Sequence, residues 1–245
     1  MKKSVLFVGF FLLTLFPVFV YAMGRNNSRF GNDDSRLDFG FFAGANKNQI
    51  TGIPKMIEPN PEGLFSGYEF EVKDRFGFLG GVFLNFRPHP LFAVQPELGF
   101  AMMHGKVSYS DINDFEYDVN FKYNYLTAGI GFKFYPWRNL FLGFTPQVGF
   151  NLTANRLFFT SNGEAQFGPD LETQQLMRNV LKGRPNVTLG FGLGYQFWNI
   201  FYVSARYNLG LSDVIETFAN SYGFVETANL SHSFQVTLGV AIPLR

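Results

Sequence analysis

The sequence predicts an all-β protein, an eight-stranded antiparallel up-and-down transmembrane β-barrel with short periplasmic turns and long extracellular loops. Three observations lead to this prediction. Eight segments alternate between large apolar residues and small or polar ones, with the period of two that is typical of strands. The small or polar positions carry few charges, unlike the water-facing side of a soluble sandwich. Short and long connections follow one another in turn along the chain, as in outer-membrane barrels.

The composition agrees with a chain that faces lipid. Of its 245 residues, 47% are hydrophobic and 33 are Phe, whereas only 16% are charged, against about 25% in soluble globular domains. The mean hydropathy of +0.02 is too high for a disordered chain and too low for a bundle of membrane helices. The absence of Cys excludes disulfide scaffolds and thiolate metal sites. A net charge of +1 argues against a nucleic-acid partner.

The N-terminus has the pattern of an export signal. Lys2 and Lys3 precede an apolar run over residues 5–20, and Ala22 supplies a small residue at the expected cleavage point. Because the run is shorter than the roughly 20 residues that a membrane-spanning helix needs, we expect a cleaved signal peptide over residues 1–22. A periplasmic segment over residues 23–36 and the barrel over residues 37–245 would follow.

The eight expected strands follow one another in three groups. The two N-terminal ones, 37–46 and 76–86, place Phe42 and Phe83 on the inner face. The next three are 91–103, 123–135 and 140–152, with large apolar outer positions at Phe92, Val94, Leu98, Phe100, Leu126, Ile130, Phe132, Phe134, Leu142, Phe144 and Phe150. The last three are 186–197, 201–212 and 233–244, with outer positions at Phe191, Leu193, Tyr195, Phe197, Phe201, Val203, Tyr207, Leu209, Phe234, Val236, Leu238 and Ile242.

The connections set the orientation. We expect short turns at 87–90, 136–139 and 198–200, and long loops at 47–75, 104–122, 153–185 and 213–231. The short turns lie on the periplasmic side, which places both chain ends there. Aromatic residues beside these turns predict an interfacial belt, formed by Tyr135, Trp137, Tyr195 and Trp198. In the longest loop, the spacing of apolar residues over 171–182 predicts a short amphipathic helix.

The lumen-facing positions carry few charges, namely Asp38, Glu97, Lys133 and Arg206. Glu97 and Arg206 lie at similar heights on the third and seventh strands, which are opposite one another in an eight-stranded barrel. Because an unpaired buried charge is costly and the lumen is narrow, we predict an ion pair between them with a structural role. Phe42, Phe83, Phe141 and Tyr202 should also face inward.

Three stretches resemble the PorT-like, porin-family group of small outer-membrane β-barrel proteins of Bacteroidota. They are Gly81–Phe83 leading into Phe92–Phe100 with its Gln-Pro-Glu-Leu run, the strand Tyr125–Tyr135, and Arg206–Asp213, similar to an RYNxGLxD strand. The resemblance implies an outer-membrane location, and some members of the group belong to the type IX secretion apparatus. Such proteins usually end in an aromatic residue, whereas this sequence ends in Arg245.

The sequence offers little catalytic chemistry. Gly190, Gly192 and Gly194 lie on the lumen face of one strand, whereas a nucleotide fingerprint needs a turn into a helix. None of the three His residues has a Ser and a carboxylate at workable spacing; His232 and Ser233, for example, point to opposite faces.

We therefore expect no enzymatic activity, cofactor or metal, and a structural or interaction role within an envelope complex. Its partners would be outer-membrane lipid and envelope proteins that contact the long loops or the periplasmic turns. A small passive porin is the alternative, and a lipid-modifying hydrolase is a second one.

Overall fold

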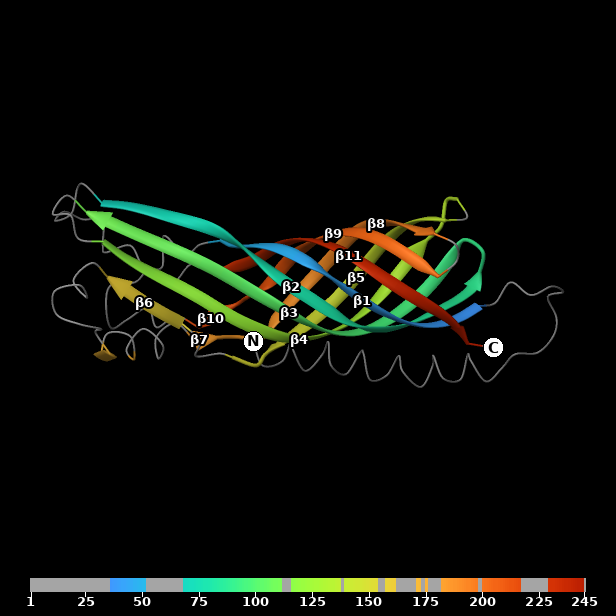
Figure 1. Ribbon diagram of the computed structural model, residues 1–245, viewed down its shortest axis with the longest axis horizontal. Helices are drawn as coiled ribbons and strands as arrows, with labels where there is room; N and C mark the ends of the chain where they lie inside the picture. The colour runs from blue at the N-terminus through green and yellow to red at the C-terminus, as the bar shows by residue number, and fades with distance from the viewer. Residues whose placement is uncertain are drawn as a thin grey trace. The chain divides into compact units, whose positions relative to one another are not determined.

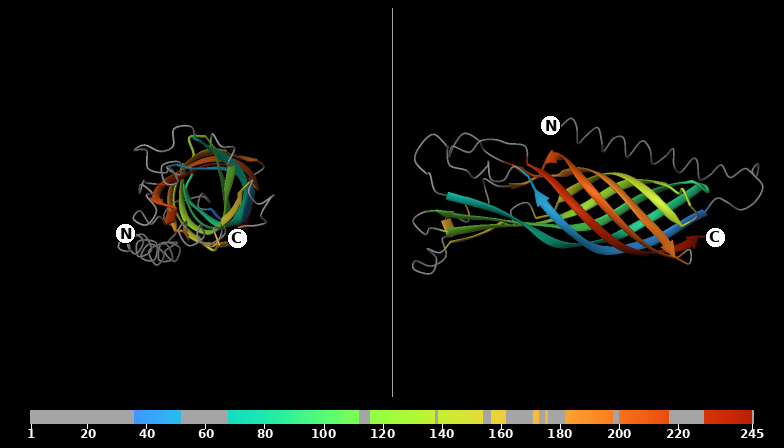
Figure 2. Two further views of the ribbon diagram at one scale, coloured as in Figure 1. Left: turned by 90° about the vertical axis from the view of Figure 1, so that its left-hand side faces the viewer. Right: turned by 90° about the horizontal axis from the view of Figure 1, so that it is seen from above.

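A closed antiparallel barrel forms the body of the protein. The computed structural model describes residues 36–51, 68–111, 116–137, 139–153, 157–161, 171–172, 175, 182–197, 200–216 and 229–244. Within these residues, eight strands pair in a ring: β1 (Arg36–Ile50), β2 (Tyr68–His89), β3 (Phe92–Asp111), β4 (Glu116–Phe134), β5 (Leu140–Asn151), β8 (Asn186–Phe197), β9 (Phe201–Asp213) and β11 (Leu230–Leu244). The pairing of β1 with β11 closes the ring, which Figure 2 shows end-on.

Three short strands are added at the long-loop end. β6 (Leu157–Ser161) pairs with the part of β4 that extends beyond β5. β7 (Lys182–Gly183) and β10 (Ile215–Glu216) form a separate two-stranded ladder. None of the helices in the described part of the chain is long and apolar enough to cross a membrane.

The alternation that predicted the barrel is visible in the exposure of its side chains. On β8 the large residues face outward, and Phe191 and Leu193 are 48% and 55% exposed. The small residues between them face the lumen, and these positions carry no charged side chains, unlike the solvent-facing side of a soluble sandwich. The eight-stranded antiparallel barrel is therefore confirmed. Two of the three short turns lie close to where the sequence placed them, whereas the first is residues 90–91 and not 87–90, because β2 continues to His89.

Two of the expected long loops are wrong, because strands occupy much of them. β3 continues to Asp111 and β4 begins at Glu116, so the expected loop 104–122 is mostly a hairpin; β1 and β2 likewise shorten the expected loop 47–75. β2, β3, β4 and β6 thus form a sheet that projects beyond the other barrel strands (Figure 1). We call this part, with its described residues 68–75, 104–111, 116–122 and 157–161, the projecting sheet.

The physical reason for the error is a change of solvent along the same strands. Below Met102 the outer face of β3 is apolar, but above it the outer positions are His104, Lys106 and Ser108. The sequence therefore stops looking like a lipid-facing strand although the ladder continues. The signal that persists is the inner face of β4, where Val119 and Phe121 are fully buried.

Several expectations concern residues outside the described ranges. They are the signal peptide over 1–22, nearly all of the 23–36 segment, and most of the 153–185 loop. Of the expected helix over 171–182, residues 171, 172 and 175 are helical, whereas Lys182 belongs to β7.

Candidate functional site

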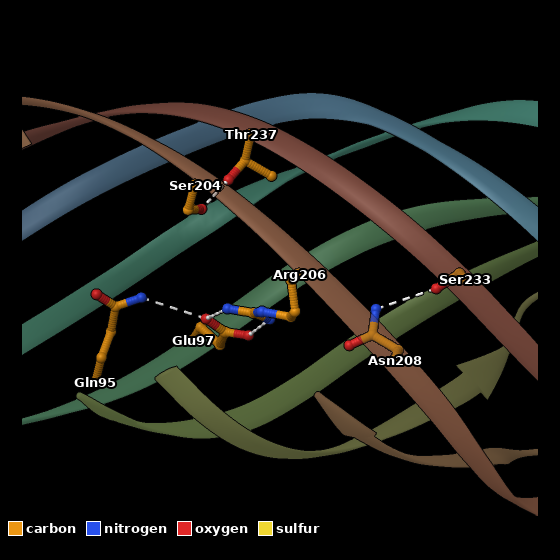
Figure 3. Close-up of polar contacts among 7 residues, drawn as sticks. All are labelled: Gln95, Glu97, Ser204, Arg206, Asn208, Ser233 and Thr237. Atoms are coloured by element: carbon orange, nitrogen blue, oxygen red, sulfur yellow. Dashed lines mark hydrogen bonds and ion pairs between the residues drawn. The ribbon is translucent and has the colours of Figure 1, made fainter. Parts of the chain in front are cut away.

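An ion pair spans the middle of the lumen. Arg206 on β9 donates from Nη1 to Glu97 Oε1 at 2.6 Å and from Nη2 to Oε2 at 3.1 Å, so the sequence-paired residues do meet (Figure 3). The Glu97 side chain is only 6% exposed. Gln95 Nε2 lies 3.3 Å from Glu97 Oε2 and adds a further donor. Two-point contact between a guanidinium and a carboxylate is the strongest form of this interaction.

The other two lumen charges lie in separate polar and aromatic surroundings. Asp38 is 2% exposed and accepts a hydrogen bond from Asn85 at 3.2 Å. The Lys133 ammonium lies 4.2, 5.2 and 5.8 Å from the ring centroids of Phe141, Tyr202 and Phe83. A cation over aromatic faces at these distances is stabilised by the ring quadrupoles. All four charged residues that the sequence assigned to the lumen are therefore inside the barrel.

An aromatic cluster fills the short-turn end of the lumen. Phe83, Phe141 and Tyr202 are at most 8% exposed, and Phe42 packs against them, as predicted. Each of the three buried rings lies against a glycine on the neighbouring strand, its cross-strand partner. The pairs are Phe83 with Gly40, Phe141 with Gly194 and Tyr202 with Gly239. A Cβ atom at any of these glycines would collide with the ring.

Tyr135 belongs to this cluster and not to the interfacial belt that the sequence predicted. It is 3% exposed, and its ring centroid lies 5.7 Å from that of Phe141. Phe134 faces outward, so alternation places its neighbour in the lumen. Trp137 and Tyr195 are 71% and 42% exposed, which is compatible with a belt, and Trp198 lies outside the described residues.

A second apolar group lies at the long-loop end of the lumen. Phe121, Tyr123 and Ile215 are at most 1% exposed. Gly183 of β7 lies against Tyr123, and the side-chain amide of Asn229 holds the backbone of Ile215 at both N–H and C=O. The ladder of β7 and β10 is thereby fixed to the inner side of β4.

Between these plugs the lumen is polar and tightly filled. Ser204 and Thr237 share a hydrogen bond of 2.6 Å, and Asn208 donates to Ser233 at 3.1 Å (Figure 3). Two internal cavities have volumes of about 30 and 40 Å³, enough for one or two water molecules each.

The described residues show no assembled hydrolase site. Ser233 faces the lumen, whereas the imidazole of His232 stacks on the outward-facing ring of Tyr207. His89 is the last residue of β2, and its Nδ1 accepts a hydrogen bond from the Leu91 N–H. Within the same residues, no three His, Asp or Glu side chains gather as they would around a metal ion.

Sequence reasoning missed the charged residues of the projecting sheet. Its basic residues Lys73, Arg75, His104, Lys106 and Lys122 lie in or beside segments expected to be loops. Their two-residue spacing on β3, at His104 and Lys106, could have revealed a strand there.

A family model for an outer membrane protein beta-barrel domain matches residues 21–216. This chain belongs to that family. Its location is therefore the outer membrane, and its short-turn end is the periplasmic end. No curated protein matches the chain.

Several solved structures of small outer-membrane proteins are similar to this chain. The attachment invasion locus protein Ail of Yersinia pestis is 11% identical, with 84% of this chain and 99% of that chain covered and a TM-score of 0.37. Neisserial surface protein A is 10% identical over 86% and 99%, with a TM-score of 0.36. OprG of Pseudomonas aeruginosa is 11% identical over 85% and 95%, with a TM-score of 0.38.

Proposed function

We propose that this protein is a non-enzymatic, non-conducting barrel that serves as an interaction component of an envelope complex. The observation that carries the proposal is the filling of the lumen at three levels. Among the described residues, the aromatic cluster, the Glu97–Arg206 pair and the apolar group around Tyr123 occupy the short-turn end, the middle and the long-loop end of the lumen. With the lumen filled in this way and no catalytic group assembled among the described residues, we assign function to the outer surfaces.

The projecting sheet carries the surface that we assign to a protein partner, at its tip (described residues 108–111 and 116–118). It raises the ends of three strands beyond the barrel, and β6 extends it (Figure 2). Interaction sites are typically carried by elements that a rigid scaffold holds in place. The resemblance to PorT-like proteins of Bacteroidota suggests that the complex is a secretion or assembly machine of the type IX kind.

The test is gentle extraction of the tagged, full-length protein from its native outer membrane, followed by mass spectrometry of what co-purifies. Two variants locate the contact. In the first, an Asn-Gly turn replaces residues 108–118, which is feasible because Val107 and Val119 are cross-strand partners. In the second, Trp137→Ser changes an exposed residue at a periplasmic turn.

We expect a stoichiometric partner with the wild-type protein and with the Trp137→Ser variant, and its loss when the hairpin is shortened. Folding of each variant is checked by its heat-modifiable migration on gels. Absence of any stoichiometric partner from the wild-type preparation would overturn the proposal. Loss of the partner only in the Trp137→Ser variant would move the contact to the periplasmic side.

A further inference from the structure

Five basic residues gather where the projecting sheet leaves the barrel. We call Lys73, Arg75, His104, Lys106 and Lys122 the rim cluster. Lys106 lies between Lys73 and Asn120 in the strand register, and His104 lies opposite Lys122. Arg75 lies within the register shift of β2 that follows Asp74; bulges of this kind re-aim side chains at barrel rims.

The rim cluster lies directly above the lipid-facing band. On β3, the outer positions change from apolar to basic between Met102 and His104, and on β4 between Leu126 and Lys122, with Asn124 between them. On β2, Phe76 and Phe78 are 74% and 71% exposed just below the basic residues. Basic groups at this height reach the headgroup region, while the rings below them remain among acyl chains.

The cluster's four Lys and Arg residues outnumber the three acidic residues that neighbour them in the strand register, Glu71, Asp74 and Asp118. Asp118 accepts an ion pair from Lys106 at 2.8 Å, and Lys122 lies 4.7 Å from the ring centroid of Phe158. Burial, together with the charges of Lys122 and Arg75, lowers the pKa of His104. An anion placed among these basic residues would reduce the repulsion between their charges.

We propose that the rim cluster binds the phosphate groups of an anionic lipid in the outer leaflet of the membrane. Charge complementarity selects the phosphate, because Lys73, Arg75 and Lys122 are exposed at the level of the headgroups. The exposed rings of Phe76 and Phe78 select a lipid over a soluble phosphate, because they lie where its acyl chains would contact the barrel. This site is distinct from the protein contact proposed for the tip of the sheet.

The experiment measures binding of lipid A to the purified full-length protein in detergent by native mass spectrometry. We compare Lys73→Gln, Arg75→Gln and Lys122→Gln, singly and combined, with wild type. Lys182→Gln is the matched control, because Lys182 is exposed at the same end of the barrel but lies on β7. Each rim substitution should weaken binding about fivefold, and the triple variant roughly 100-fold.

The Lys182→Gln variant should bind lipid A as tightly as the wild-type protein does. Lipid A without its phosphates should bind the wild-type protein as weakly as intact lipid A binds the triple variant. Equal binding of the dephosphorylated lipid would overturn the proposal, as would wild-type affinity in the triple variant. So would equally tight binding of a soluble phosphorylated saccharide, since the aromatic band would then contribute nothing. If the triple variant does not fold, the single variants decide. Loss of the protein partner leaves all these readouts unaffected, so the two proposals fail separately.

Discussion

The ring of Tyr202 on β9 covers Gly239 on β11, its partner across the strand pair. The three atoms nearest to a Cβ added at Gly239 all belong to the Tyr202 side chain. The glycine and the ring are therefore one packing unit: the missing side chain makes room for an aromatic ring that blocks the lumen. Aromatic side chains over neighbouring glycines also help to fix strand register.

This relationship predicts a strong coupling between the two positions. Gly239→Ala should destabilise the protein by about 1–3 kcal/mol, because the added methyl group overpacks the site. In a Tyr202→Leu background the same substitution should cost much less, because the ring is gone. The measurement is a double-mutant cycle from urea unfolding of the protein in detergent. Additive free energies would show that backbone, and not the ring, excludes a side chain at Gly239.

The ion pair predicts a different kind of coupling. Arg206→Gln leaves the Glu97 carboxylate buried without its guanidinium partner, and Glu97→Gln leaves the Arg206 guanidinium without its carboxylate partner. Each substitution should therefore destabilise the barrel by about 3 kcal/mol. The double variant should lose less than the sum, because no charge remains to be desolvated. Unfolding can be followed by the fluorescence of the two Trp residues.

A neutral hydrogen bond in the same lumen supplies the control for that experiment. Ser204→Ala removes the contact with Thr237 and should cost about 1 kcal/mol. An effect of Arg206→Gln no larger than that of Ser204→Ala would mean that water compensates the charge of Glu97 fully.

The barrel and its central ion pair could be predicted from sequence because both follow from alternation. Once each strand has an inner and an outer face, the height of Glu97 and Arg206 follows from counting residues from the short turns. The same rule would have placed Tyr135 in the lumen, and grouping it by residue type with Trp137 led to the wrong assignment. Composition near a turn is weaker evidence than position on a strand.

The projecting sheet could not be predicted in the same way, because its outer face meets water. Lys106 and Asp118 form an ion pair across β3 and β4, and in the sequence such residues look like those of a loop. The rim cluster depends on this extension, since its members come together only when the ladder continues past Met102. Beyond Met102 the outer face no longer alternates with apolar residues, so no pattern in the sequence indicated that the strands continue.

The filled lumen predicts that the protein does not conduct ions. Wild-type protein in a planar lipid bilayer should show no steady single-channel current. The variant Glu97→Ala/Arg206→Ala should also remain closed, because the aromatic cluster below and the apolar group around Tyr123 above are untouched. A steady wild-type conductance would contradict this and would favour a passive porin.

The projecting sheet should loosen in mild acid because of His104. Burial, with the charges of Lys122 and Arg75, lowers the pKa of His104 below 6.5 in the folded protein. As the pH falls below about 6.5, the His104 imidazole is protonated in the unfolded sheet but stays neutral in the folded sheet. Folding therefore becomes less favourable. Protonation of Asp118 also makes folding less favourable as the pH falls, but over a lower range of pH. Burial alone would raise its pKa, but hydrogen bonds from Lys106 and Ser108 and the nearby lysines outweigh it and hold the pKa below 3.8.

Hydrogen exchange of the amides of the projecting sheet, compared at pH 7.5 and 5.5 after correction for intrinsic rates, measures this effect. Exchange of these amides should quicken at the lower pH, whereas amides of β8 and β9 deep in the barrel should not change. His104→Gln removes the titrating group while keeping a polar side chain, and should abolish the difference between the two pH values. Because Asp118 remains ionised at pH 5.5, its ion pair with Lys106 contributes equally at both. A pH response that persists in the His104→Gln variant would assign the loosening to another group.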